Sequence, residues 1–121
     1  MISEKDSAST TDLYQIALLI DQLKHDDRSF RINAHKNLRK IADALGPERT
    51  RKELVPFLAA CCDDDDDDVI AVMAENIGSL AGQVGGPEFA HVLLGPLEIL
   101  LTSEEASIRD VAIQSLRIIL T

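Results

Sequence analysis

The sequence predicts an all-α protein, and within that class an α-solenoid made of repeated helix pairs. Two observations carry this prediction. Three segments with the same apolar pattern begin at residues 30, 69 and 108, each 39 positions after the one before. A second apolar segment of helical length precedes each of the three, and short acidic or Gly-Pro stretches separate the segments. Repeated helix pairs of this kind bury their apolar faces by stacking on their neighbours.

The three repeated segments are the predicted second helices of each unit. They read FRINAHKNLRKIA (30–42), VIAVMAENIGSLA (69–81) and IRDVAIQSLRIIL (108–120). In each, apolar residues recur at i, i+4, i+8 and i+11, which is one stripe of an α-helix. The predicted core residues are Phe30, Ala34, Leu38 and Ile41, then Val69, Met73, Ile77 and Leu80, and finally Ile108, Ala112, Leu116 and Ile119.

The predicted first helices cover 12–24, 48–62 and 87–101. The first of them has Asp12 as its expected N-cap and places Leu13, Ile16, Ala17, Ile20 and Leu23 on one face. The other two share a Gly-Pro-Glu start: Gly suits the end of a helix, Pro suits the first position of the next, and Glu suits its first turn. Both also contain an internal proline, Pro56 and Pro96, which should kink the helix.

These helices divide the chain into a flexible tail at 1–11 and repeats at 12–46, 47–85 and 86–121. The 39-residue period lies close to the range of HEAT and armadillo repeats. We therefore predict an α-solenoid of three HEAT repeats, with antiparallel helix pairs in a right-handed superhelical stack. A compact six-helix bundle is the alternative, and the common register of the three copies favours the solenoid.

Composition excludes several classes of protein. The 121 residues carry a net charge of −9, which argues against binding to a phosphate backbone, and an apolar content of 45% argues against disorder. No apolar run is long enough for a membrane span, and the polar N-terminal stretch does not resemble a signal peptide. The two cysteines predict reduced thiols, as in the cytoplasm or nucleus. We find no signature of catalytic residues, a cofactor or a metal site, so we expect no enzyme.

The predicted turns within each pair, 25–29, 63–68 and 102–107, are all acidic. Stacked at the repeat period, they should form a docking edge for basic side chains of a partner. The predicted partner-binding residues are Asp26, Asp27, Arg28, Asp65, Asp66, Asp67, Asp68, Ser103, Glu104 and Glu105. The alternative is that these carboxylates only stabilise helix N-termini, a role that suits Asp68 and Glu105. The middle turn is predicted to be one residue longer than the third, by comparison of Pro56–Val69 with Pro96–Ile108.

The run CCDDDDDD, residues 61–68, suggests a divalent-cation-binding protein as another alternative. An EF-hand loop requires a glycine within the acidic run, and this run has none. Cys61 is expected in the core and Cys62 near the turn, where the neighbouring aspartates should raise the thiol pKa. We therefore place cation binding below partner binding.

Three contiguous strings resemble one known family. DLYQIALLIDQLKHDD, ALGPERTRKELVPFL and VGGPEFAHVLLGPLEILLTSEEASIRD are similar to the scaffold (A, or PR65) subunit of protein phosphatase 2A. The resemblance runs from about Asp12 to Thr121. It implies three N-terminal repeats of a fifteen-repeat horseshoe, whose turns hold regulatory B subunits while missing C-terminal repeats hold the catalytic subunit. An unrelated HEAT or armadillo adaptor is the alternative.

Two further expectations follow. HEAT units often carry a basic residue early in the second helix, and Arg31 and Arg109 match that pattern, whereas the middle copy has Ile70. A ladder of arginines between repeats should therefore be interrupted in the middle. The last predicted helix has no fourth repeat over its outer side, so we expect that end to pack against another copy of the chain.

Overall fold

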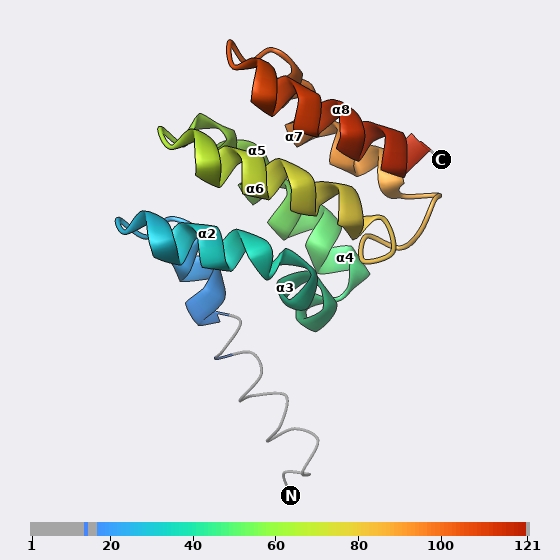
Figure 1. Cartoon of the computed structure of the whole chain (residues 1–121). Helices are drawn as coiled ribbons and strands as arrows, with labels where there is room; N and C mark the ends of the chain where they lie inside the picture. The colour runs from blue at the N-terminus through green and yellow to red at the C-terminus, as the bar shows by residue number, and fades with distance from the viewer. Residues whose placement is uncertain (1–13, 15–16, 121) are drawn as a thin grey trace, which may run out of the picture.

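The computed structural model describes residue 14 and residues 17–120, and these form an all-α solenoid, as predicted (Figure 1). Three layers of helices follow one another along the stack, at 17–45, 47–80 and 90–120. α6 (Asp67–Ile77) packs between α2 (Arg28–Lys36) and α8 (Ala106–Leu120), and α5 (Val55–Ala60) packs against α7 (Leu94–Leu101). None of the described helices is both long and apolar enough to cross a membrane. The predicted tail and the predicted cap Asp12 lie outside the described residues.

The first layer contains a helical segment at 17–22, then α2 and α3 (Leu38–Leu45). The second helix predicted over 30–42 is longer than expected and is interrupted at Asn37. The Asn37 side chain donates to the carbonyl of Asn33 at 2.7 Å, an alternative to regular helical bonding that asparagine readily adopts. The layer ends at Gly46, where a φ of 87° stops the helix, as glycine allows.

The second layer changes helix type repeatedly along its length. It contains α4 (Pro47–Arg49), the π-helical turn η1 (Thr50–Leu54), α5, the 3-10 turn η2 (Cys61–Asp63), α6 and the 3-10 turn η3 (Gly78–Leu80). Pro56 stands in the first turn of α5, directly after the π turn. The missing N–H of Pro56 thus coincides with the change in hydrogen bonding, and the kink predicted at this proline stays a prediction.

The third layer contains the 3-10 turn η4 (Ala90–Leu93), α7 and α8. Its predicted helical start at Pro87 is wrong, because residues 87–89 form a turn. Two glycines with positive φ, Gly85 at 116° and Gly86 at 93°, precede Pro87. A single such glycine precedes Pro47, and there the predicted helical start is correct. Pro96 lies in the first turn of α7, after a 3-10 segment, so the helix type changes near this proline too, and the kink predicted there stays a prediction.

The predicted core stripe is largely correct. Nine of its residues are buried: Ala34, Leu38, Ile41, Val69, Met73, Ile77, Leu80, Ile108 and Ala112. Leu116 and Ile119 are partly buried against this core. Phe30 is the exception, since its side chain is 45% exposed and its ring meets His25 edge-on with 4.5 Å between centroids. Ala17 is also exposed, Leu23 is buried, and Leu13 and Ile16 lie outside the described residues.

The last layer buries the inner side of α8. Ile108 and Ala112 of the predicted core stripe face the core, while Ile113, Ile118 and Leu120 are exposed. Self-association through this end of the solenoid stays a prediction.

The predicted extra residue in the middle turn is also wrong. The second helices of the three layers begin 39 positions apart, at Arg28, Asp67 and Ala106. Cys61 and Leu100, likewise 39 positions apart, are both buried at the ends of the preceding helices. Leu54 and Leu93 keep the same spacing of 39 and are also buried, whereas Pro47 and Pro87 are 40 positions apart, so the extra residue lies between Pro47 and Leu54, where η1 is found. A π turn takes one more residue than an α turn and so absorbs the insertion without altering the acidic turn.

Candidate partner-binding edge

The three turns within the pairs lie side by side along one edge of the solenoid, at the left of Figure 1. They share one hydrogen-bonding pattern, in which a side chain accepts from the backbone N–H two residues later. The acceptors are His25 Nδ1 for Asp27, Asp64 Oδ1 for Asp66, and Ser103 Oγ for Glu105, at 2.9, 2.9 and 3.1 Å. Three residue types at equivalent positions thus give the turns a common geometry, which the sequences did not reveal.

Arginines of the second helices hold two of these turns. Arg31 Nη1 donates to the carbonyls of His25 and Asp26 at 2.7 and 2.9 Å, and Arg109 Nη1 donates to that of Ser103 at 2.6 Å. Ile70 occupies the equivalent place in the middle layer and is buried. The acidic turn of that layer therefore has no arginine of its own beneath it.

Arg31 supplies the missing cation from the neighbouring layer. Its Nε lies 2.9 Å from Oδ2 of Asp64, and the two side chains are only 12% and 11% exposed. Among the described residues, no ion pair joins the second layer to the third. The predicted interruption of the arginine ladder at Ile70 thus agrees with the distribution of ion pairs.

Arg28 forms a second link between the first two layers. Its guanidinium lies 2.6 Å from Asp66 and 2.9 Å from Asp68. Asp66, and not Asp68, is the N-cap of α6, accepting from the N–H groups of Asp68 and Val69, while Asp68 lies in the first turn of that helix, where its charge is favourable. The hydrogen bond from Arg28 lowers the pKa of Asp66, and the same bond raises the pKa of Arg28.

The predicted partner-binding residues therefore fall into two groups. The side chains of Asp27, Arg28, Asp66, Asp68 and Ser103 already bond within the chain. Those of Asp26, Asp67, Glu104 and Glu105 form no hydrogen bond or ion pair with a described residue and are exposed, and that of Asp65 is 99% exposed with its Oδ1 3.9 Å from Arg31. The second group is the one that remains available to a partner.

A depression of about 500 Å³ lies between the first two turns. Its lining residues are Lys24, His25, Asp26, Arg31, Asp63, Asp64 and Asp65. Asp63, which the sequence reasoning did not include, is 86% exposed, with its carboxylate 4.0 Å from Lys24 Nζ. The carboxylates of Asp26, Asp63 and Asp65 are exposed, whereas the paired Arg31 and Asp64 are largely buried.

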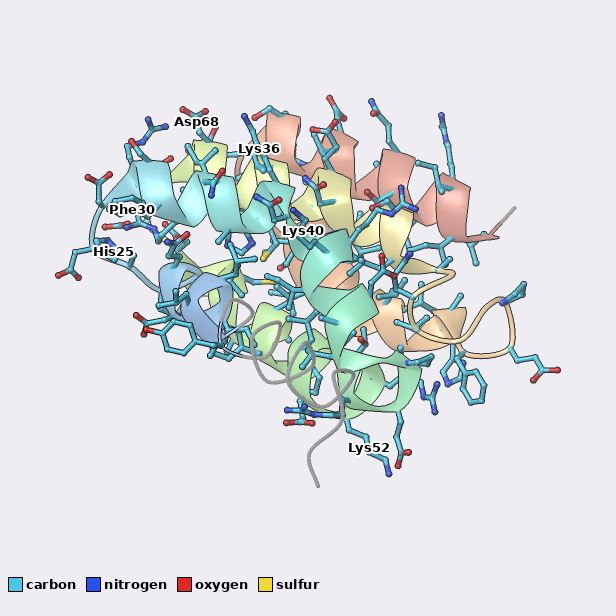
Figure 2. All side chains as sticks on the ribbon, turned by 90° about the horizontal axis from the view of Figure 1, so that it is seen from below. His25, Phe30, Lys36, Lys40, Lys52 and Asp68 are labelled. Carbon is cyan, nitrogen blue, oxygen red and sulfur yellow. The ribbon has the colours of Figure 1, made fainter. Side chains whose placement is uncertain are left out.

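Phe30 and His25 stand at the tip of the first turn, away from the rest of α2 (Figure 2). Sequence reasoning placed Phe30 in the core because Val69 and Ile108 occupy the equivalent positions, and both of those are buried. Phe30 directly follows an acidic turn, which was a sequence signal for a place at the edge. Only the packing of the layers distinguishes the edge from the core at this position.

The cysteines behave as predicted. Cys61 is buried in the core, and Cys62 is partly buried with its Sγ 3.6 Å from the carbonyl of Pro96. Burial is the main cause that raises the pKa of each thiol to about 11, and Asp63 adds to it. Within the described ranges, no group of three or more His, Cys, Asp or Glu side chains is arranged to hold a metal ion.

No family model matches the chain, but its full sequence is similar to several curated proteins. It is 55% identical over 105 residues to the regulatory A subunit of protein phosphatase PP2A from Schizosaccharomyces pombe, covering 87% of this chain and 18% of that protein. It is 57% identical over 104 residues to the alpha isoform of the 65 kDa regulatory A subunit of serine/threonine-protein phosphatase 2A from Arabidopsis thaliana, covering 86% and 18%. The human beta isoform is 53% identical over 105 residues, covering 87% and 17%. The chain thus spans less than a fifth of the length of these relatives, and the similarity confirms the resemblance found in its motifs.

Proposed function

We propose that this chain, which belongs to the family of regulatory A subunits of protein phosphatase 2A, is a non-catalytic scaffold segment that binds other subunits through its acidic edge. One observation supports this proposal above the others. Three turns of common geometry stand along one edge, and each presents carboxylates that no described residue neutralises. A repeated, rigidly held set of exposed anions suits a docking surface better than it suits a catalytic centre.

The proposed partner presents lysine or arginine side chains to this edge. A single exposed ion pair contributes about 0.2–1 kcal/mol, so useful affinity requires contacts to several turns at once. Asp26 and Asp65 are the strongest candidates, because both line the depression and both are exposed. Phe30, 45% exposed beside them, supplies the aromatic anchor that such interfaces commonly need.

The partners that the family resemblance implies are the regulatory B subunits of the phosphatase. The catalytic subunit would then bind other repeats of the family protein. The relatives are named regulatory rather than catalytic subunits, which agrees with a scaffold role. Two thiols held protonated by burial fit a reducing compartment, so we place the protein in the cytoplasm and nucleus.

A divalent-cation-binding function is less well supported by the same geometry. Arg31 and Arg28 already pair with Asp64, Asp66 and Asp68, which are three of the six carboxylates in the aspartate run. A cation would therefore have to displace arginines that also join the first two layers.

The test is binding of this chain to purified B subunits, measured by calorimetry or biolayer interferometry. The double variant Asp26→Lys and Asp65→Lys should bind roughly tenfold more weakly, because two attractive contacts become repulsive. The matched control Glu88→Lys and Glu98→Lys makes the same change in net charge at exposed residues away from this edge. Unchanged binding of the first variant, or an equal loss in the control, would contradict the proposal.

A further inference from the structure

Three cationic side chains on α2 and α3 have no partner within the described chain. Lys36, Arg39 and Lys40 are exposed, and none forms a hydrogen bond or ion pair with a described residue. We name these three residues the cationic face. Two other exposed cations are neutralised one helical turn away, in the pairs Arg49–Glu53 at 2.6 Å and Lys52–Glu48 at 2.7 Å. The cationic face is thus unusual for a chain with a net charge of −9.

Carboxylates near the cationic face do not neutralise it. Asp43 lies one turn beyond Arg39 but accepts a hydrogen bond from Gln83 Nε2 at 3.2 Å, without an ion pair to the arginine. Glu75 occupies the position in α6 equivalent to Lys36, and no ion pair joins the two. Lys36 ends α2, and Arg39 and Lys40 lie in the first turn of α3, so three positive charges without an ion pair fall within five residues of the chain.

We propose that the cationic face binds a short acidic segment of a partner protein. Positions 36 and 40 lie on either side of the break at Asn37, so their Cα atoms are at most about 14 Å apart, a distance that about four residues of an extended peptide cover. Three or four neighbouring Asp or Glu side chains can therefore contact all three cations together. The cationic face belongs to the α2–α3 helices and not to the acidic turns, so the inference does not depend on the function proposed above (Figure 2).

The surroundings favour an acidic peptide over a nucleic acid. α6, which packs beside α2, carries Asp67, Asp68 and Glu75, and the stretch 67–80 contains no lysine or arginine. A long polyanion that continued past the three cations in this direction would meet these carboxylates. A short acidic segment avoids them, and basic residues that flank it could contact them.

The first experiment uses an eight-residue fluorescent peptide of alternating Asp and Glu. Its binding to this chain is followed by fluorescence anisotropy at low ionic strength. Replacing Lys36 and Lys40 by Gln should weaken binding about three- to tenfold, since two exposed ion pairs are lost. The matched variant Arg49→Gln and Lys52→Gln removes the same charge from residues that already have partners, and it should bind the peptide with the affinity of the unmodified chain.

A second measurement locates the peptide on the surface. Carbodiimide coupling joins a carboxylate to a lysine in contact with it, and mass spectrometry should find the peptide on Lys36 or Lys40. Lys52, which lies well apart from them in Figure 2, should stay unmodified. The proposal is overturned if the unmodified chain does not bind the peptide, if both double variants lose affinity equally, if coupling occurs only elsewhere, or if a 12-base-pair DNA duplex binds more tightly than the peptide. Circular dichroism of both variants confirms that the exposed substitutions leave the fold intact.

Discussion

The two interfaces between layers use different chemistry to solve the same packing problem. Between the first and second layers, Arg28 and Arg31 pair with aspartates of the middle turn, and the buried His35 lies in α2. Between the second and third layers, no ion pair occurs among the described residues. Ser115 Oγ instead donates to the carbonyl of Ala74 at 2.5 Å, and Gly78 packs directly against Ser115.

The difference follows from single residues at equivalent positions. Where the first layer has Arg31, the second has Ile70, and where the first layer has His35, the second has Ala74. Arg51 contacts the segment that connects the second layer to the third: it donates to the carbonyl of Val84 and lies 4.0 Å over the Phe89 ring, without a carboxylate. One repeated unit therefore stacks through charges at one interface and through close neutral packing at the next.

The largest expected effect comes from the partly buried arginine of the charged interface. Arg31→Met should lower the free energy of unfolding by about 3 kcal/mol, because it leaves Asp64 unpaired at low exposure and removes two hydrogen bonds to backbone carbonyls. Urea unfolding monitored by circular dichroism measures the change.

Arg28→Met is the control for that prediction. Arg28 is half exposed, so its ion pairs are screened by water and salt, and its replacement should have a clearly smaller effect. Raising the salt concentration to about 1 M should abolish the effect of Arg28→Met and leave most of that of Arg31→Met. Equal effects of the two substitutions would show that burial does not distinguish them.

The next effect in size is a dependence of stability on pH. Burial lowers the pKa of His35 to about 4, and neither ring nitrogen has a hydrogen-bond partner. A histidine with a depressed pKa binds its proton in the unfolded state first, so stability is complete above about pH 6.5 and falls as the pH drops toward 4. We expect a loss of about 2 kcal/mol between pH 7 and pH 5.

His35→Leu should remove most of this loss of stability between pH 7 and pH 5. The control His91→Gln, at an exposed position, should leave the loss unchanged. Urea titrations at pH 7, 6 and 5 make the comparison. The carboxylate of Asp66, whose pKa is lowered by Arg28, contributes only at lower pH and in the same direction. A His35→Leu variant with an unchanged pH profile would assign the acid sensitivity to another group.

The smallest of the three effects concerns the neutral interface. A Cβ at Gly78 would lie 2.7 Å from Ser115 Oγ and 3.0 Å from its Cα, so Gly78→Ala must push the layers apart. After the gain from a less flexible unfolded chain, we expect a net loss of about 1 kcal/mol. Gly82→Ala, where a Cβ would meet nothing within 4 Å, should be neutral or slightly stabilising in the same unfolding assay. A neutral Gly78→Ala would mean that this interface is looser than the packing indicates.

Periodicity alone predicted the fold class and most of the core. The spacing of Ala34, Met73 and Ala112 was sufficient, because these residues lie within the inner stripes of their helices and not at the edge, where Phe30 stands. The acidic turns were also visible as a pattern. The sequence did not show which carboxylates remain unpaired, since that depends on how far the side chains of Arg28 and Arg31 reach into the next layer.

The sequence by itself therefore determined the repeat, the all-α class, the family and the acidic character of the edge. The tertiary structure alone decided that Phe30 is exposed, that a π turn absorbs the inserted residue, and that Asp64 and Asp66 bind arginines while Asp65 stays in solvent. The physical reason is that burial of a stripe is a local, periodic property. Whether a charged side chain is paired, and whether a residue at the edge is covered, depends on the neighbouring layer. No local sequence pattern encodes the position of that layer.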